Sequence, residues 1–434
     1  MKRIIDYLDQ ANAFFLSYIA VVLIIGLGSY FSWKSRFFQF RCIPAIGRNL
    51  WKWSTQNQFH RGIHPLKVFF TSIGGMIGIG NIAAVTTAVQ IGGPGALFWM
   101  WIVGILGSLI KYSEIYLGHK YRIQNSQGNY DGGPMYFLNK AWKTHFASLL
   151  VACLLCIYGT EVYQFSVIID SITSNWPINR FLIIPLLISF ILYAGLGGFL
   201  RVSKICVLVL PFFTTLYFLM CLWIIFHHFN ELPHLFSLII RSAFEGQAAK
   251  GGFLGSSLWL ALQQGGARAA YSADLAIGYD SIIHSASSVI DSKKQAQLSI
   301  LGVFIDNLVC TCSTLVVLIT GLWKASPMIA SSRIMQSAFE LYFPYMHTFM
   351  PLLIFILGYT TIIAYFSVCL KCAKFMHQKN GVFIYLIYAI CAYTIFSFYD
   401  QTYALMVMAF SQSFLMILNL FGIYQLRKEI EFKA

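Results

Sequence analysis

The chain has 434 residues, of which 58% are hydrophobic and only 11% are charged, and its mean hydropathy is +0.68. Soluble domains carry about 25% charged residues, so this composition excludes a soluble globular protein and indicates an integral membrane protein. The net charge of +14 would suit a nucleic-acid-binding protein, but the basic residues lie in loops between apolar segments, where membrane proteins place them.

Apolar windows of about 20 residues, each long enough for a helix to cross a bilayer, recur along the chain. We count eleven, at 12–33, 66–90, 94–118, 146–172, 181–199, 202–227, 252–285, 296–323, 347–375, 381–398 and 401–425. Membrane-spanning strands are shorter and alternate polar with apolar residues, a pattern that these windows lack. The sequence therefore predicts an all-α, multi-pass membrane protein with about eleven spanning helices in a single domain, residues 1–434.

Basic residues are divided unequally between alternate loops. One set of loops holds 21 of the 30 Lys and Arg residues: 34–67, 119–145, 200–204, 286–295, 371–380 and the segment after 425. The other set holds 7: 1–11, 173–180, 228–250 and 324–346. Cytoplasmic loops carry the excess of Lys and Arg, so the C-terminus is predicted to be cytoplasmic and the N-terminus outside.

Two of the predicted helices are interrupted by glycines. The first interruption lies in TSIGGMIGIGNIAAV, residues 71–85, and the second in LWLALQQGGARAAYSADLAIG, residues 258–278. A glycine-rich break frees backbone N–H and C=O groups, which inside a bilayer must face protein, water or a ligand. Breaks at matching places in two halves of a membrane protein point to the binding site of a transporter.

The positions of the two breaks also predict an internal repeat. When the extra N-terminal helix 12–33 is set aside, the other ten helices form two runs of five, 66–227 and 252–425. Each run begins with a broken helix. Because five is an odd number, the second run enters the membrane from the opposite side, so an inverted repeat is expected.

The first break combines exposed backbone with one amide side chain, in Gly78, Gly80 and Asn81. The N-terminus of a half helix can hold a carboxylate, and freed carbonyls can bind a cation such as Na⁺ together with the Asn81 oxygen. The alternative is that these glycines only allow helices to pack closely.

The second broken segment carries polar residues directly after its glycines. The segment's candidate residues are Gly265, Gly266, Arg268, Ser272 and Asp274. An arginine in the middle of a membrane span is costly and nearly always paired or functional, and the expected partners of Arg268 are Asp274 and Glu161. Glu161 could take up and release a proton, or it could be a static counter-ion for Arg268.

Further polar groups lie inside other spans. Thr360 and Thr361 place two hydroxyls in one apolar helix, where threonine often bonds to a carbonyl of its own helix. Lys111 and Glu114 are three residues apart near the inner end of their helix and are expected to form a structural ion pair. Asp306 adds a carboxylate in the span 296–323.

Residues 78–138 contain GIGNIAAV, IGGPGALFWMWIVGILGSLIKYSEIYLGHKYR and GGPMYFL in succession. This block resembles the alanine/glycine:cation symporters of bacteria and archaea, and weaker matches extend through 268–284, 301–311 and 347–375. The resemblance implies a leucine-transporter-type fold of inverted five-helix repeats in the bacterial inner membrane. It also implies a small neutral amino acid as substrate and Na⁺ as the coupling ion.

The resemblance further implies which residues hold the substrate. Gly78, Gly80 and Asn81 match the family's GTGNIAG break. Gln164 matches a glutamine that faces the substrate, and Ser272 matches the serine of the family's FSNEAG stretch.

A cation site is implied in the same way. Thr360 and Thr361 match a Ser-Thr pair whose hydroxyls are expected to complete a Na⁺ site with the backbone at Gly75 and Gly78.

The chain also departs from the family's pattern at four places. Ile79 replaces the threonine of the first motif, Ala84 its last glycine, and Ala273-Asp274 the Asn-Glu pair, while Glu161 replaces an asparagine. A lost amide and a lost hydroxyl should weaken or redirect the recognition of an amino acid. The gained carboxylate of Glu161 could shift coupling from Na⁺ toward H⁺.

The sequence thus predicts a secondary active symporter, not an enzyme, that imports a small neutral amino acid with Na⁺ and uses no other cofactor. Alanine, glycine or D-alanine is the expected substrate. Its carboxylate would lie at the first break beside Gln164, and its ammonium would meet carbonyls of the second break.

Two alternatives remain open from the sequence. The first is a proton-coupled amino-acid transporter, or one of altered specificity, that uses Glu161. The second is a sensor of the same fold that binds an amino acid without transporting it.

Overall fold

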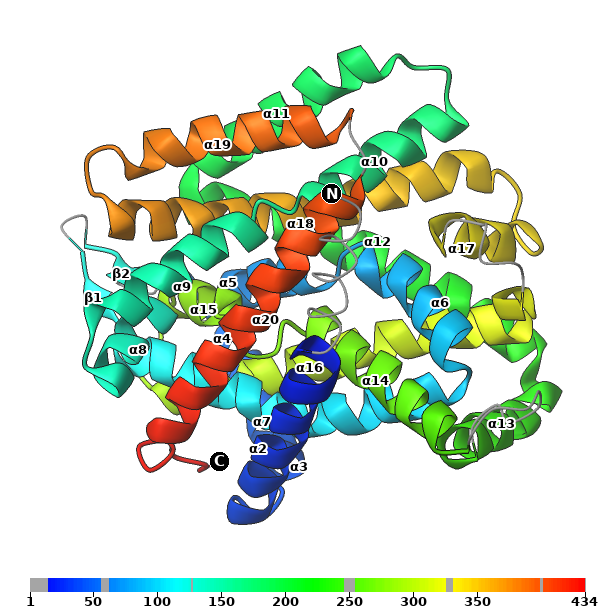
Figure 1. The fold of residues 1–434 in the computed structure, drawn as a ribbon, viewed down its shortest axis with the longest axis horizontal. Helices are drawn as coiled ribbons and strands as arrows, with labels where there is room; N and C mark the ends of the chain where they lie inside the picture. The colour runs from blue at the N-terminus through cyan, green and yellow to red at the C-terminus, as the bar shows by residue number, and fades with distance from the viewer. Residues whose placement is uncertain are drawn as a thin grey trace.

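The computed structural model describes residues 15–55, 62–125, 128–245, 254–324, 331–398 and 401–433, and helices dominate it (Figure 1). Two short strands, β1 (Ile123–Gln124) and β2 (Tyr130–Asp131), pair as an antiparallel hairpin. The prediction of an all-α membrane protein is confirmed.

Its main helices are α2 (Val21–Lys34), α3 (Phe38–Arg41), α4 (Ile43–Thr55), α5 (Pro65–Met76), α6 (Gly80–Gly92), α7 (Gly95–Lys120), α8 (Pro134–Trp142), α9 (His145–Tyr158), α10 (Val162–Asn175), α11 (Arg180–Leu196), α12 (Gly198–His227), α13 (Leu232–Phe244), α14 (Leu254–Ser272), α15 (Tyr279–Ser285), α16 (Ser292–Ile319), α17 (Ser331–Glu340), α18 (Met346–Met376), α19 (Gly381–Phe396) and α20 (Gln401–Gln425).

Length and composition mark seven helices of the described part of the chain as able to cross a membrane. They are Pro65–Gly92, Gly95–Lys120, His145–Asn175, Gly198–His227, Ser292–Ile319, Met346–Met376 and Met406–Gln425. The apolar helices α2, α11 and α19 have 14, 17 and 16 residues, fewer than the about 20 that cross the hydrocarbon core. The total of eleven spans and the inverted repeat therefore stay predictions.

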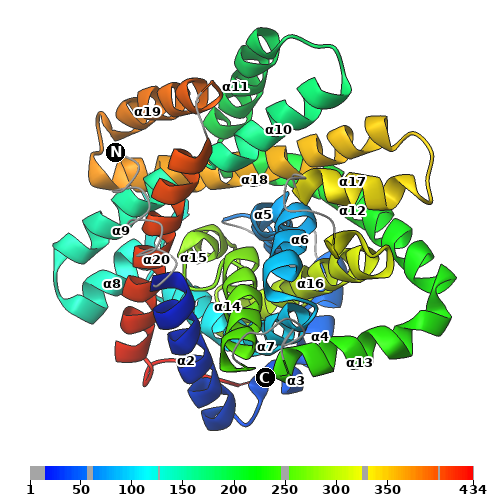
Figure 2. The ribbon, with the colours of Figure 1, turned by 45° about the vertical axis from the view of Figure 1, so that its right-hand side comes forward.

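The two broken helices lie side by side in the middle of the helical bundle, as Figure 2 shows. α6 packs against α14, and α5 packs against α15 and α18. The long helices α7 and α16 contact each other and support the broken helices, α7 mainly through α14 and α16 through α6 and α5. The helix ends that flank the two breaks are thus brought together inside the protein.

The first break is found where the sequence places it. α5 ends at Met76 and α6 begins at Gly80, with Ile77, Gly78 and Ile79 between them. A Cβ at Gly78 would lie 2.8 Å from both Gln164 Nε2 and Thr361 Oγ1, so a larger residue here would collide with its neighbours. The glycine keeps the backbone of the break close to α10 and α18.

The second break lies further along the chain than its glycines indicate. Gly265 and Gly266 are inside the intact helix α14, which ends at Ser272, and the interruption covers residues 273–278. A Cβ at Gly265 would lie 2.1 Å from the carbonyl oxygen of Ala96 in α7. These glycines therefore allow close helix packing, and the prediction that they form the break is wrong.

Replacing Gly265 by alanine should lower the midpoint of thermal unfolding in detergent by several degrees, because the added methyl group must push α14 away from α7. Overpacking of this kind costs about 1–3 kcal/mol. Gly26 is the matched control, since an added Cβ there meets nothing within 4 Å and alanine favours a helix. An unchanged midpoint for Gly265→Ala would contradict this account of the packing.

A third interruption divides the predicted helix 146–172. α9 ends at Tyr158 and α10 begins at Val162, so Gly159, Thr160 and Glu161 lie between two half helices. Glu161 adopts a left-handed backbone conformation with φ of 55°, which is unusual for a residue with a side chain. Such conformations cluster at functional sites, so this interruption marks Glu161 as a candidate functional residue.

Loops that the charge pattern assigns to one side contact one another. On the more basic side, Ile63 bridges to Ser287, Arg122 donates to the carbonyls of Ser285 and Ser287, Lys371 pairs with Asp131, and Lys293 pairs with Glu431. On the other side, Arg333 donates to Ser174 and Gln336 donates to Asn175. The division of the loops into two sets therefore matches the contacts among the described residues.

Candidate substrate and cation site

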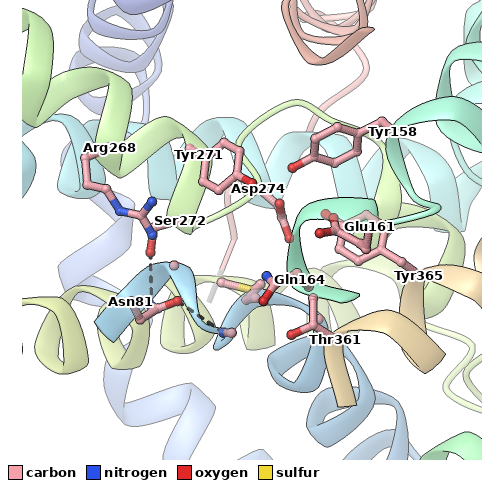
Figure 3. Close-up of a pocket in the computed structure, with 14 residues that line it drawn as sticks. Asn81, Tyr158, Glu161, Gln164, Arg268, Tyr271, Ser272, Asp274, Thr361 and Tyr365 are labelled. Atoms are coloured by element: carbon pink, nitrogen blue, oxygen red, sulfur yellow. Dashed lines mark hydrogen bonds between the residues drawn. The ribbon is translucent and has the colours of Figure 1, made fainter. Parts of the chain in front are cut away.

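The breaks and the α9–α10 interruption surround a small pocket, which Figure 3 shows. Its lining residues are Gly75, Met76, Gly78, Gly80, Asn81, Tyr158, Glu161, Gln164, Arg268, Tyr271, Ser272, Asp274, Thr361 and Tyr365. Apart from Thr360, all residues predicted to bind the substrate or the cation line this pocket, as do Glu161, Arg268 and Asp274, whereas Gly265 and Gly266 do not. The cavity has a volume of about 20 Å³, which is room for one water molecule, so side chains must move to admit an amino acid.

One wall of the pocket is a hydrogen-bonded cluster that joins three helices. Asn81 Nδ2 of α6 donates to Asp306 Oδ1 of α16 at 2.5 Å and to Ser272 Oγ of α14 at 3.0 Å. Ser272 Oγ donates to the Asp306 carboxylate, with distances of 2.7 and 2.8 Å to its two oxygens. Asp306 is 1% exposed and was noted in the sequence only as a polar group. The only indication of this role in the sequence is a carboxylate in the middle of a membrane span, where it is costly unless it is bonded.

Two N–H groups of the first break are already bonded to side chains. Gly78 N donates to Asn81 Oδ1, and Ile79 N donates to Gln164 Oε1, both at 3.2 Å. Asn81 is thus engaged through both its oxygen and its nitrogen. In this conformation Asn81 and Gln164 stabilise the broken backbone.

Arg268 lies near the end of α14 with its guanidinium group against the start of α6. A Cβ at Gly80 would lie 2.7 Å from Arg268 Nη2. The arginine is 6% exposed, and its Nε and Nη2 atoms have no hydrogen-bond partner among the described residues. Two donors of a buried guanidinium are thus left to meet an anion beside the N-terminus of α6.

The predicted ion pairs of Arg268 are wrong. Within the described ranges, neither Glu161 nor Asp274 forms an ion pair with it. The reason is the direction of the backbone: α14 ends at Ser272, so Asp274 lies past the end of the helix and faces away from Arg268 (Figure 3).

Glu161 and Asp274 point toward each other instead, as Figure 3 shows. They are 2% and 4% exposed, and both adopt the left-handed conformation, with φ of 55° and 48°. Glu161 Oε2 and Asp274 Oδ2 have no hydrogen-bond partner in the part of the chain that is described. The pocket therefore has unsatisfied donors at Arg268 and unsatisfied acceptors at these two carboxylates.

The two threonines of α18 face different surroundings. Thr361 Oγ1 donates to the Gly74 carbonyl of α5 at 3.1 Å and lies next to Gly78. Thr360 Oγ1 bonds at 3.0 Å to the carbonyls of Ile356 and Leu357 in its own helix. Only Thr361 lines the pocket.

Lys111 of α7 does not pair with Glu114 as expected. It forms an ion pair with Asp280 of α15, and Nζ donates to the carbonyls of Ala273 and Asp274 at 2.7 Å each. Both residues follow the end of α14, so their carbonyls are not part of its hydrogen-bond pattern, and leaving them buried without a donor would be costly. Lys111 thus occupies two of the second-break carbonyls, the group that the sequence predicts will meet the substrate's ammonium group.

Interrupted helices that enclose a small polar pocket inside a helical membrane protein are typical of membrane transporters. Residues 1–433 match the sequence profile described as the sodium:alanine symporter family, and the chain belongs to that family. The resemblance indicated by the motifs of 78–138 is confirmed. Family membership also establishes, at a general level, a non-enzymatic protein that couples amino-acid transport to Na⁺.

Curated relatives cover most of the chain. An "Uncharacterized transporter" of Haemophilus influenzae is 32% identical over 76% of this chain and 73% of its own length. The "Sodium/alanine symporter AgcS" of Methanococcus maripaludis is 26% identical over 92% of this chain and 89% of its own. The "Probable sodium/glutamine symporter GlnT" of Bacillus subtilis is 26% identical over 99% and 90%. The names differ in substrate, so similarity alone does not select an amino acid.

Proposed function

We propose that the protein imports a small neutral amino acid, such as alanine, glycine or D-alanine, together with Na⁺. The observation that carries the proposal is that one pocket contains both unsatisfied donors, on Arg268, and unsatisfied acceptors, on Glu161 and Asp274. A zwitterion presents one carboxylate and one ammonium group, which are the partners that these side chains need.

The substrate's carboxylate would lie at Arg268 and the N-terminus of α6, where a guanidinium group and the helix dipole both favour an anion. Its ammonium group would lie at Glu161 and Asp274. This orientation keeps the carboxylate at the first break, as expected from the sequence. It moves the ammonium group from the carbonyls of the second break to the two carboxylates.

Na⁺ would bind between the Thr361 hydroxyl and the backbone at Gly75 and Gly78. The supporting observation is that Thr361 already contacts the carbonyl of Gly74 beside the break. The protein would be a multi-pass protein of the bacterial inner membrane with its C-terminus in the cytoplasm. Its inverted repeats would move relative to each other, so that the site opens to one side of the membrane at a time.

Uptake into proteoliposomes tests the proposed function. The purified protein should accumulate labelled alanine, glycine or D-alanine when Na⁺ is imposed outside, and choline in place of Na⁺ should abolish accumulation. Glutamine belongs in the same series as a larger neutral substrate. No accumulation of any neutral amino acid under a Na⁺ gradient would contradict the proposal.

Proton coupling is the second candidate, because Glu161 is buried with an unpartnered oxygen inside the pocket. If Glu161 carries the coupling proton, Glu161→Gln should abolish accumulation but spare the exchange of internal for external substrate. If Glu161 binds the substrate's ammonium group, the same change should raise KM about 10-fold in both assays. Full Na⁺-driven accumulation with an unchanged KM would remove Glu161 from both roles.

A further inference from the structure

The ammonium group of Lys111 is surrounded by oxygen atoms inside the protein. Lys111 is 1% exposed, and its Nζ donates to the carbonyls of Ala273 and Asp274 at 2.7 Å and pairs with the carboxylate of Asp280. An ammonium group has three donors and no acceptor, so these three oxygens satisfy it completely.

These oxygens have the arrangement of a cation site in a broken membrane helix. Ala273 and Asp274 directly follow the end of α14, so their carbonyls are freed by the second break. Freed carbonyls at such breaks coordinate cations, and a carboxylate supplies the compensating charge. Asp280 is 0% exposed, which makes its charge costly unless a cation lies beside it.

Asp280 also links this position to the first broken helix. Ser72 Oγ of α5 donates to Asp280 Oδ1 at 2.5 Å, and the neighbouring Tyr279 donates from its hydroxyl to the Thr71 carbonyl at 3.1 Å. One cation at Lys111 Nζ thus holds together α7, the second break, α15 and, through Asp280, α5.

We propose that Lys111 is a tethered cation that fills a second cation-binding position in this protein. Its ammonium group replaces a free monovalent cation among the Ala273 and Asp274 carbonyls and the Asp280 carboxylate, and it fixes the half helices α5 and α15 against α7. This position is separate from the Na⁺ position proposed at Thr361, and it does not depend on which substrate is carried.

Two variants of Lys111 distinguish the effect of losing the positive charge from the effect of leaving an empty space. Lys111→Ala removes the ammonium group and leaves room for a small ion, whereas Lys111→Met removes the charge but keeps most of the volume. Each should lower the midpoint of thermal unfolding in detergent by about 5 °C or more, because a buried carboxylate loses its partner. Methylammonium, ethylammonium, Na⁺ and K⁺ chlorides are then compared at constant ionic strength with choline chloride.

At least one small cation should restore half or more of the loss in Lys111→Ala, and none should do so in Lys111→Met. A midpoint of Lys111→Ala that is the same in all five salts would overturn the proposal, as would a Lys111→Met variant as stable as the parent. If Lys111→Ala is not recovered from cells, the yield of monodisperse protein after extraction with and without ethylammonium gives the same comparison.

Lys371 provides a matched control, because it pairs with Asp131 at 2.8 Å but lies away from the breaks, with 22% of its side chain exposed. Lys371→Ala should not be selectively stabilised by small ammonium ions. If it responds as strongly as Lys111→Ala, the effect is a general one and the proposal fails. None of these measurements requires transport, so their outcome is independent of the test of the proposed function.

Discussion

Replacing Arg268 by glutamine should reduce the kcat/KM of Na⁺-driven amino-acid uptake by about 100-fold or more. The expected loss corresponds to about 2.7 kcal/mol, within the range for removing one partner of a buried charge pair. The physical reason is that Arg268 holds two unpartnered donors beside the start of α6, where a substrate carboxylate would lie. Initial rates in proteoliposomes measure the effect.

Arg268→Lys is the control for charge. It should reduce kcat/KM by only about 10-fold, because lysine keeps the charge but cannot form two parallel hydrogen bonds with a carboxylate. Alaninamide, which lacks the carboxylate charge, gives a second check by competition. The parent protein should prefer alanine strongly over alaninamide, and Arg268→Gln should lose most of that preference. Uptake by Arg268→Gln within about 3-fold of the parent would show that Arg268 does not hold the carboxylate.

Replacing Thr361 by valine should raise the Na⁺ concentration that gives half-maximal uptake by about 10-fold. Valine has the shape of threonine without its hydroxyl, and the 10-fold change corresponds to about 1.4 kcal/mol, within the range for one lost polar contact. The hydroxyl lies between α18 and the first break, where the Na⁺ ligands are proposed. The half-saturating concentration is read from uptake rates at a fixed amino-acid concentration.

Thr360→Val is the matched control for this prediction. The Thr360 hydroxyl bonds only to carbonyls of its own helix, and the residue is outside the pocket lining. Its removal should leave the Na⁺ dependence unchanged within about 2-fold. An equal or larger shift for Thr360→Val would contradict the assignment of Thr361 as the ligand and would favour the other member of the pair.

The sequence predicted the first break correctly because the neighbouring side chains leave no room for a residue larger than glycine there. A side chain at Gly78 would meet Gln164 and Thr361, so the glycine pattern and the break coincide. In the second half they do not coincide. Gly265 and Gly266 serve helix packing, while the break itself contains Asp274 and Ala276 in left-handed conformations that their residue types do not predict.

The partners of the buried charges could not be predicted from spacing along the chain. Lys111 and Glu114 suit an ion pair three residues apart on one helix, yet the ammonium group binds the second break, which is more than 160 residues away. Arg268 was expected to pair with Asp274 or Glu161, but Asp274 lies past the end of α14 and faces Glu161 instead. The breaks therefore predict which residues lie at the pocket. The contacts among these residues depend on tertiary packing, which spacing along the chain does not show.

The dependence of alanine binding on Na⁺ tests the central claim most directly. Titration calorimetry on the purified protein would give the Kd of alanine in Na⁺ and in choline. Because the Na⁺ and substrate positions share the first break, Na⁺ should lower the Kd by about 10-fold or more. An alanine Kd that is the same in both salts, or no binding of any neutral amino acid in Na⁺, would contradict the account.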